Sequence, residues 1–213
     1  MNDQPQAKPR RKHFTMLRTF VAADVLTLGN GFCGAGSILS LMQYTASGED
    51  RFLWLALALL PVSLLLDFAD GRVARWRHRS STLGADLDSL ADVISFGMAP
   101  AALGFAAGLR GGWDVVILLY FVCCGVSRLA RYNVTAEKLS EGSDKVKYFE
   151  GTPIPTSVVL VAVLAFAAWQ GRIGFGNVWG GAWDIGWQLH PLSLLFALSG
   201  TLMISKTLKI PKL

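Results

Sequence analysis

Long apolar runs alternate with short polar connections along the whole chain. Each run approaches the ~20 residues that an α-helix needs to cross the ~30 Å hydrocarbon core of a bilayer. Backbone groups in lipid must be hydrogen-bonded internally, so runs of this length predict helices. The pattern therefore predicts an all-α integral membrane protein with six transmembrane helices. The runs cover roughly residues 21–44, 52–73, 86–109, 113–133, 153–170 and 190–207.

The N-terminal segment, before the first apolar run, is more polar and more basic than that run. Residues 1–13 are polar and basic and contain two prolines, which predicts a flexible tail. The stretch from Phe14 to Ala23 combines apolar side chains with Arg18 and is predicted to form a short interfacial helix. Residues 14–213 are then expected to form a single membrane domain.

Charge distribution predicts how the helices are oriented. Hydrophobic residues make up 52% of the chain, and its formal net charge is +5. If the N-terminus is cytoplasmic and six helices follow, all but three of the 20 basic residues lie on the cytoplasmic side; the exceptions are Arg51, Arg110 and Arg172. The positive-inside rule therefore predicts a multi-pass cell-membrane protein with both termini in the cytoplasm. This distribution argues against a nucleic-acid partner.

Four aspartates interrupt the second and third apolar runs. A carboxylate at bilayer depth is costly, which makes these residues functional candidates. Steps of three and four residues place Asp67 and Asp70 on one face of a helix, and Asp88 and Asp92 on one face of the next. Two facing carboxylate pairs suit two hard divalent ions, Mg²⁺ or Mn²⁺, that would hold a pyrophosphate. Residues with little side chain share these faces and would admit a phosphate or a flat base: Gly71, Ala74 and Gly84.

Two other interpretations of the acidic residues remain at this stage. The aspartates could pair with neighbouring arginines in a solvated cluster at the membrane edge, although that does not explain the small residues beside them. They could also bind cations in a transporter, but they lie near one membrane face and no inverted repeat is evident. The arginines concerned are Arg72, Arg75, Arg77 and Arg79.

The motif D-x2-D-G-x2-A-R-x8-G-x3-D-x3-D resembles the signature of the CDP-alcohol phosphatidyltransferase family. Members move a phosphatidyl group from a CDP-linked lipid to an alcohol and release CMP. The resemblance implies that Asp67, Asp70 and Asp88 are metal ligands and that Asp92 is both a ligand and the catalytic base. It also implies a homodimer and a CDP-binding surface. The implied CDP-binding residues are Gly71, Ala74, Arg75 and Gly84.

The first helix adds a polar face to this arrangement. Asp24, Thr27 and Asn30 recur at steps of three and are expected to lie together at the headgroup level. The segment resembles the family's first helix, which implies that Thr27 and Asn30 help to close the nucleotide site. Simple hydrogen bonds between helices explain the pattern equally well.

Three segments bear on the acceptor alcohol: residues 93–100, 128–133 and 151–155. They resemble the phosphatidylserine synthases of the family, which implies CDP-diacylglycerol and L-serine as substrates in a membrane-lipid setting. Glycerol 3-phosphate, inositol phosphate and choline remain alternatives. Arg131 is predicted to bind the serine carboxylate, with Arg128, Ser95 and Asn133 in support. For the arginines, the alternative is that they reach lipid phosphates at the interface.

Three further expectations concern single features. Pro100 is predicted to kink the third apolar helix, because proline lacks a backbone donor. The stretch from Glu150 to Thr156 is expected to form a lip over the site. His190 lies far from the motif in sequence and is expected to take no part in it.

Overall fold

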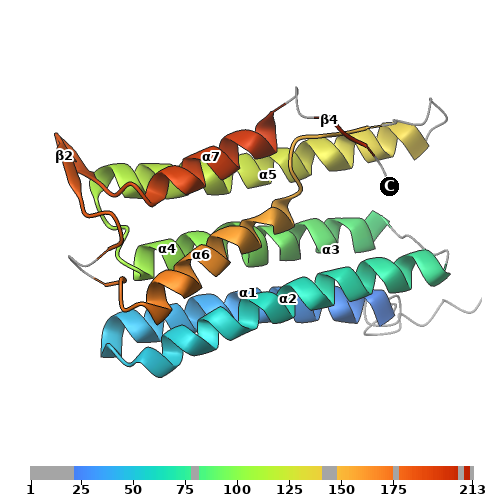
Figure 1. The fold of residues 1–213 in the computed structure, drawn as a ribbon. Helices are drawn as coiled ribbons and strands as arrows, with labels where there is room; N and C mark the ends of the chain where they lie inside the picture. Colours follow the sequence, from blue (N-terminus) through green and yellow to red (C-terminus); the bar gives the residue numbers. More distant parts are fainter. Residues whose placement is uncertain (1–21, 78–81, 141–147, 175–177, 206–208, 212–213) are drawn as a thin grey trace, which may run out of the picture.

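The computed structural model describes residues 22–77, 82–140, 148–174, 178–205 and 209–211. Within these residues the predicted apolar runs are helical, and the helices lie side by side in an elongated bundle (Figure 1). A π-helical segment, η2 (Val93–Met98), joins α3 to α4, and a 3-10 turn, η3 (Ile154–Ser157), precedes α6. The α-helices are α1 (Ala22–Ser47), α2 (Asp50–Arg77), α3 (Thr82–Asp92), α4 (Ala99–Ala106), α5 (Gly112–Ser140), α6 (Val158–Trp169) and α7 (Ser193–Ile204).

Four helical stretches are long and apolar enough to cross a membrane. They are Ala23–Ser47, Asp50–Val73, Gly84–Ala106 and Gly112–Thr135. The apolar helices Ile154–Trp169 and Ser193–Ile204 are shorter, so six spans remain a prediction. The predicted tail and nearly all of the predicted interfacial helix lie outside the described residues.

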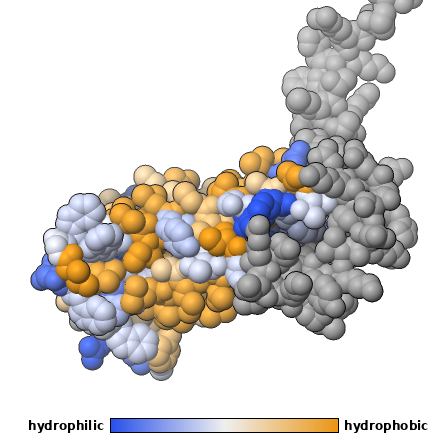
Figure 2. All heavy atoms as spheres, turned by 90° about the horizontal axis from the view of Figure 1, so that it is seen from above, coloured by the Kyte–Doolittle hydropathy of each residue, from blue (hydrophilic) through white to orange (hydrophobic). Residues whose placement is uncertain are grey.

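The surface of the bundle suits a lipid environment. Phe32 is 77% exposed and Leu65 is 67% exposed, an arrangement that is costly in water but not in hydrocarbon. Apolar atoms dominate the middle of the face seen in Figure 2, and hydrophilic residues lie toward its ends. The chain is therefore a helical membrane protein.

The helices form two outer pairs with a central group of helices between them. α1 packs along α2 at one side, α5 packs along α7 at the other, and α3, η2, α4 and α6 lie between them (Figure 1). Two small antiparallel pairs add to the helices: β1 (Tyr148–Glu150) with β4 (Lys209–Pro211), and β2 (Trp183–Ile185) with β3 (Trp187–Leu189). The end of α2 and the start of α3 lie at the same end of the bundle.

Glycines on α1 bring it close to both of its neighbours. A Cβ atom at Gly34 would lie 2.7 Å from Ser95 Cα, whereas one at Gly31 would make an ordinary 3.5 Å contact with Ala91 Cβ. On the other side, a Cβ atom at Gly29 would lie 3.3 Å from Leu66 Cδ1 of α2. Small residues thus permit the close helix contacts that hold α1 beside α2, α3 and η2.

The helix type changes next to Pro100, where a kink was predicted. The π-helical segment η2 immediately precedes Ala99, whose backbone N–H donates to Ile94 O, five residues back. Pro100 follows as the second residue of α4, and its missing N–H leaves a carbonyl of η2 without a helical donor. The wider turn begins directly after Asp92 and buries Ser95, Phe96 and Gly97.

A buried aspartate closes the end of the bundle that carries the β2–β3 hairpin. Asp114 is fully buried, and its carboxylate accepts hydrogen bonds from the backbone N–H groups of Gly111 (2.9 Å) and His190 (2.8 Å). Its Oδ2 also lies 2.5 Å from His190 Nδ1. His190 therefore has a structural partner on α5, 76 residues away, which the sequence interpretation did not anticipate.

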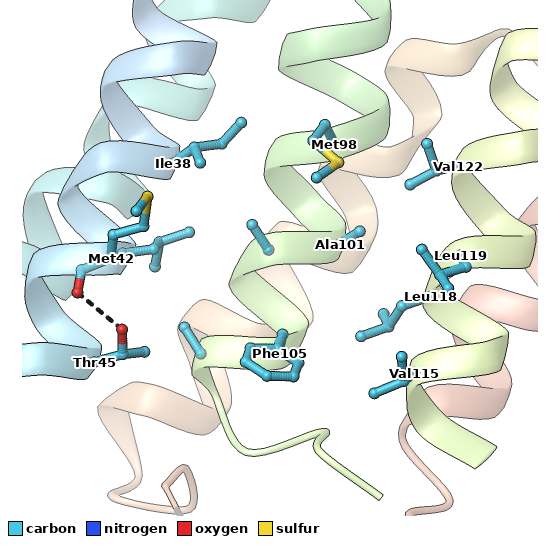
Figure 3. A pocket seen from close by; sticks show the side chains of 13 residues that line it. Ile38, Met42, Thr45, Met98, Ala101, Phe105, Val115, Leu118, Leu119 and Val122 are labelled. Atoms are coloured by element: carbon cyan, nitrogen blue, oxygen red, sulfur yellow. Dashed lines mark hydrogen bonds between the residues drawn. The ribbon is translucent and has the colours of Figure 1, made fainter. Parts of the chain in front are cut away.

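An apolar cavity of about 310 Å³ lies between α1, α4 and α5 (Figure 3). The one hydroxyl of its lining, on Thr45, donates to Met42 O at 2.8 Å. No charged residue lines it, so it offers nothing to a nucleotide or an amino acid.

Candidate active site

The four aspartates converge from the end of α2 and from α3. Carboxylate oxygens of Asp67, Asp70 and Asp88 all lie within 4.8 Å of one another. Asp70 and Asp92 are buried, and Asp67 and Asp88 are half-buried. Asp92 interacts electrostatically with the other three but is not part of the closest group. Helical spacing thus brings these side chains to one place, as predicted.

This cluster suits a divalent metal. Carboxylates so close together repel one another, and a bound cation removes that repulsion. An all-oxygen donor set matches the preference of Mg²⁺ and Mn²⁺. Among the described residues, ion pairs join only Arg51 to Glu49 and His190 to Asp114. The Arg72 guanidinium instead lies 4.5 Å from the centre of the Phe68 ring, so the structure gives no support to an Arg72–aspartate pair.

Two polar residues of α1 bind the aspartates directly. Thr27 Oγ1 donates to Asp70 Oδ2 at 2.8 Å, and Asn30 Nδ2 donates to Asp92 Oδ1 at 3.3 Å. Both side chains are buried, at 4% and 0% exposure. The polar face predicted on α1 therefore points at the acidic cluster. Its contacts are hydrogen bonds between helices, one of the two explanations that the sequence left open.

Gly71 leaves room on the face of α2 that carries Asp67 and Asp70. A Cβ atom at Gly71 would meet nothing within 4 Å among the described residues. Gly84 is half-buried near the start of α3. The side chains of Ala74 and Arg75 lie outside the described part of the chain. Within the described part of the chain, no side chain thus covers Gly71 next to Asp70.

The two candidate arginines of α5 differ in their surroundings. Arg128 is half-buried, its Nε has no hydrogen-bond partner, and its guanidinium interacts electrostatically with Asp92. Arg131 is exposed, and its Nε donates to Ser127 O at 3.4 Å on the same helix. Of the two arginines, Arg128 is the more buried and is the one with an electrostatic interaction with Asp92.

The other two acceptor candidates are bound to neighbouring helices. The Ser95 hydroxyl is fully buried and donates to Asn30 O at 3.0 Å. Asn133 exchanges hydrogen bonds with Ser89, whose hydroxyl donates to Asn133 Oδ1 at 3.1 Å. Ser89 was not predicted, although its place directly after Asp88 in the motif is a signal that could have found it. These contacts join η2 to α1 and α3 to α5 next to the aspartates.

Comparison with known proteins places this geometry in a family. The family model for CDP-alcohol phosphatidyltransferase matches residues 20–199. The chain belongs to the CDP-alcohol phosphatidyltransferase family. The matched region includes α1, the whole acidic motif, Arg128 and Arg131. The family resemblance suggested by the motif is confirmed.

Three relatives show where in this family the chain lies. It is 47% identical over 204 residues to CDP-diacylglycerol–serine O-phosphatidyltransferase of Saccharomyces cerevisiae, covering 94% of this chain and 74% of that protein. The enzyme of the same description from Bacillus subtilis is 32% identical over 67% of this chain and 73% of its own length. That of Mycobacterium tuberculosis is 39% identical over 63% of this chain, and the match covers only 45% of that longer protein.

Proposed function

We propose that this phosphatidyltransferase moves the phosphatidyl group of CDP-diacylglycerol to L-serine, giving phosphatidylserine and CMP. The observation that supports it most is the convergence of the family's aspartates in one half-buried cluster. The relatives described as serine O-phosphatidyltransferases support the acceptor. The activity places the protein in phospholipid biosynthesis.

The reaction needs a base for the serine hydroxyl and relief of charge on the pyrophosphate. The hydroxyl oxygen attacks the phosphorus that bears diacylglycerol, the bond from this phosphorus to the bridging oxygen breaks, and CMP leaves with that electron pair. Asp92 accepts the hydroxyl proton. It suits this role because its carboxylate lies apart from the closest carboxylate group, and Asn30 fixes its orientation by a hydrogen bond.

The remaining aspartates suit metal binding. Asp67, Asp70 and Asp88, with Asp92, would hold Mg²⁺ or Mn²⁺, two ions in this proposal, and bound metal would neutralise charge on the pyrophosphate. Thr27 orients Asp70, and Asn30 orients Asp92. The open space at Gly71 would receive the CMP moiety, bordered by Ala74, Arg75 and Gly84.

The wider organisation of the protein is also a proposal. Residues 14–213 form the membrane domain, six helices cross the cell membrane, and the active site and both termini are cytoplasmic. The asymmetry of basic residues supports this orientation. Family resemblance supports a homodimer. Arg128, Arg131, Ser95 and Asn133 remain the candidate acceptor-side residues, and the electrostatic interaction of Arg128 with Asp92 favours Arg128.

A direct assay tests the proposal. Purified protein in mixed micelles with CDP-diacylglycerol and Mn²⁺ should release CMP only when L-serine is added, with one phosphatidylserine formed for each CMP. Chelation of the metal should stop the reaction, and added Mn²⁺ should restore it. Turnover with glycerol 3-phosphate, inositol phosphate or choline, but not with L-serine, would refute the proposed acceptor.

A further inference from the structure

Tryptophans gather at the end of the bundle that lies opposite the aspartate cluster. Six of the chain's seven tryptophans belong to this end, and each of the six is between 42% and 74% exposed. They come from the starts of α2 and α5, the end of α6 and the connection between α6 and α7. Because α2 and α5 lie on opposite sides of the bundle (Figure 1), these side chains surround its end and do not form a single patch. The six are Trp54, Trp113, Trp169, Trp179, Trp183 and Trp187.

The β2–β3 hairpin within this connection separates apolar from polar side chains. In an antiparallel pair, residues directly opposite each other share a face, and neighbours along a strand lie on opposite faces. Asp184 pairs with Gln188, so these two exposed polar side chains share one face of the hairpin. The other face is apolar, and all of its side chains except that of Leu189 are exposed. It consists of Trp183, Ile185, Trp187 and Leu189.

The hairpin is fixed against the start of α5. Trp113 Nε1 donates to Ile185 O at 3.0 Å, and the centre of the Trp113 ring lies 5.6 Å from that of the Trp187 ring. A Cβ atom at Gly112 would lie 2.8 Å from atoms of the Trp187 ring, so the missing side chain lets this ring pack on α5. The exposed rings are therefore held outward by a fixed scaffold.

The end of α6 carries a second exposed aromatic group. The ring of Phe166 lies 5.9 Å from that of Trp169 and 5.8 Å from that of Trp179. Val178, directly before Trp179, is buried, and its Cγ2 would lie 2.5 Å from a Cβ atom at Gly108. The connection is thus anchored after α4 as well as at the start of α5, and large aromatic rings are exposed at both places.

The lengths of the helices indicate the depth of the hairpin in the bilayer. The 12 residues of α7 rise about 18 Å, less than the ~30 Å of the hydrocarbon core. β3 packs against α5, and the hairpin lies beside the start of α5, past the point where α7 begins (Figure 1). A two-stranded hairpin has backbone groups at its edges that need water, which the headgroup region supplies and the hydrocarbon core does not. Indole rings are also favoured at the headgroup level.

We propose that the β2–β3 hairpin is an interfacial membrane anchor. Its apolar face lies between the headgroups and acyl chains of the leaflet opposite the aspartate cluster, and Asp184 and Gln188 face the water. The anchor holds α6 and α7, which are short, at a fixed depth. A protein partner or a second copy of the chain would cover one side of the bundle, whereas a bilayer meets every side at one depth. The distribution of tryptophans around this end therefore favours lipid as the partner.

Fluorescent labels on neighbouring hairpin residues test this placement. In a protein whose cysteines are replaced by alanine, single cysteines at Trp183, Asp184, Ile185 and Gln188 each carry an environment-sensitive fluorophore. The protein is reconstituted into vesicles of phosphatidylethanolamine and phosphatidylglycerol. These contain phosphatidylcholine with a nitroxide quencher either near the headgroup or near the end of the acyl chain. Iodide, present on both sides of the membrane, is the aqueous quencher.

The two faces should give opposite results. Labels in Trp183→Cys and Ile185→Cys should emit at shorter wavelength, resist iodide, and be quenched more by the nitroxide near the headgroup than by the one near the chain end. Labels in Asp184→Cys and Gln188→Cys should emit at longer wavelength and be quenched by iodide. The polar-face variants are the matched controls, because they lie on the same strands at the same end of the bundle.

Three results would overturn the proposal. Equal quenching of all the labels by iodide would place the hairpin in water. Protection of the apolar-face labels from both iodide and nitroxide would show that a protein surface covers them. Stronger quenching by the nitroxide near the chain end would place the hairpin in the hydrocarbon core. Should Trp183→Cys disturb the hairpin, Ile185→Cys compared with Asp184→Cys still decides, because the bond from Trp113 is to the backbone of Ile185.

Discussion

Asp92 differs from the other three aspartates in what surrounds it. Its carboxylate lies outside the closest oxygen group and interacts electrostatically with Arg128, whereas carboxylate oxygens of Asp67, Asp70 and Asp88 lie within 4.8 Å of one another. Burial does not separate Asp92 from Asp70, because the two are 6% and 5% exposed. Three close carboxylates suit a metal, and a carboxylate that stands apart from them suits proton transfer at an acceptor alcohol.

The two roles predict different losses on substitution. Asp88→Asn should weaken Mn²⁺ binding and abolish activity, because it removes one member of the closest oxygen cluster. Asp92→Asn should also remove most activity, since a base contributes about 10²- to 10⁴-fold, but should still bind Mn²⁺ and CDP-diacylglycerol more tightly than Asp88→Asn does. Metal titration and substrate binding measure this difference. Equal loss of binding in both variants would contradict a distinct role for Asp92.

At the scale of helices, the sequence predicted the features that depend on a single helix. The apolar runs anticipated the helical segments, and steps of three and four residues anticipated the shared faces of Asp67 with Asp70 and of Asp88 with Asp92. Contacts between distant segments were not predictable from spacing. The Asp114–His190 pair joins residues 76 positions apart, and the choice between Arg128 and Arg131 depends on how α5 is rotated against α3.

The contact between α1 and η2 gives a prediction at the scale of helix packing. Gly34→Ala would put a Cβ atom 2.7 Å from Ser95 Cα, and this backbone can move only if η2 shifts. We expect a loss of about 1–3 kcal/mol in stability. Gly31→Ala, one turn earlier on the same helix, is the matched control because its Cβ atom would make an ordinary contact at 3.5 Å. Melting temperatures in detergent compare the two; equal values would show that η2 adapts freely.

The hydrogen bonds that Asp114 accepts from Gly111 and His190 give a second prediction at this scale. Asp114→Ala would leave the buried backbone N–H groups of Gly111 and His190 without their acceptor, at a cost of about 1–3 kcal/mol for each unsatisfied group. The melting temperature should fall while the KM for L-serine stays unchanged, because Asp114 lies about four turns along α5 from Arg128. Asp184→Ala, at an exposed position of β2, should change neither value. A large change in KM for Asp114→Ala would show that the two ends are coupled.

For the whole molecule, the central question is how the bundle sits in the membrane. The four long helical stretches are each able to cross, and the two shorter ones, Ile154–Trp169 and Ser193–Ile204, decide whether the chain crosses four or six times. A helix rises 1.5 Å per residue, so these two need their flanking segments or a locally thinner bilayer to span ~30 Å. α7 packs along α5, and α6 packs against α2 and α4. This packing supports insertion of α6 and α7 at the same depth as the other helices.

Cysteine labelling in sealed right-side-out vesicles tests this arrangement. In a protein whose Cys33, Cys123 and Cys124 are replaced by alanine, single cysteines are introduced at Ser47, at the end of α1, and at Ser143, which lies outside the described residues. The asymmetry of basic residues predicts that an impermeant reagent modifies Ser47→Cys in intact vesicles and Ser143→Cys only after lysis. A third cysteine at exposed Asp184, in the connection before α7, should label like Ser47→Cys if α6 crosses the membrane. If it labels like Ser143→Cys, then α6 and α7 do not span the bilayer and the six-helix topology is wrong.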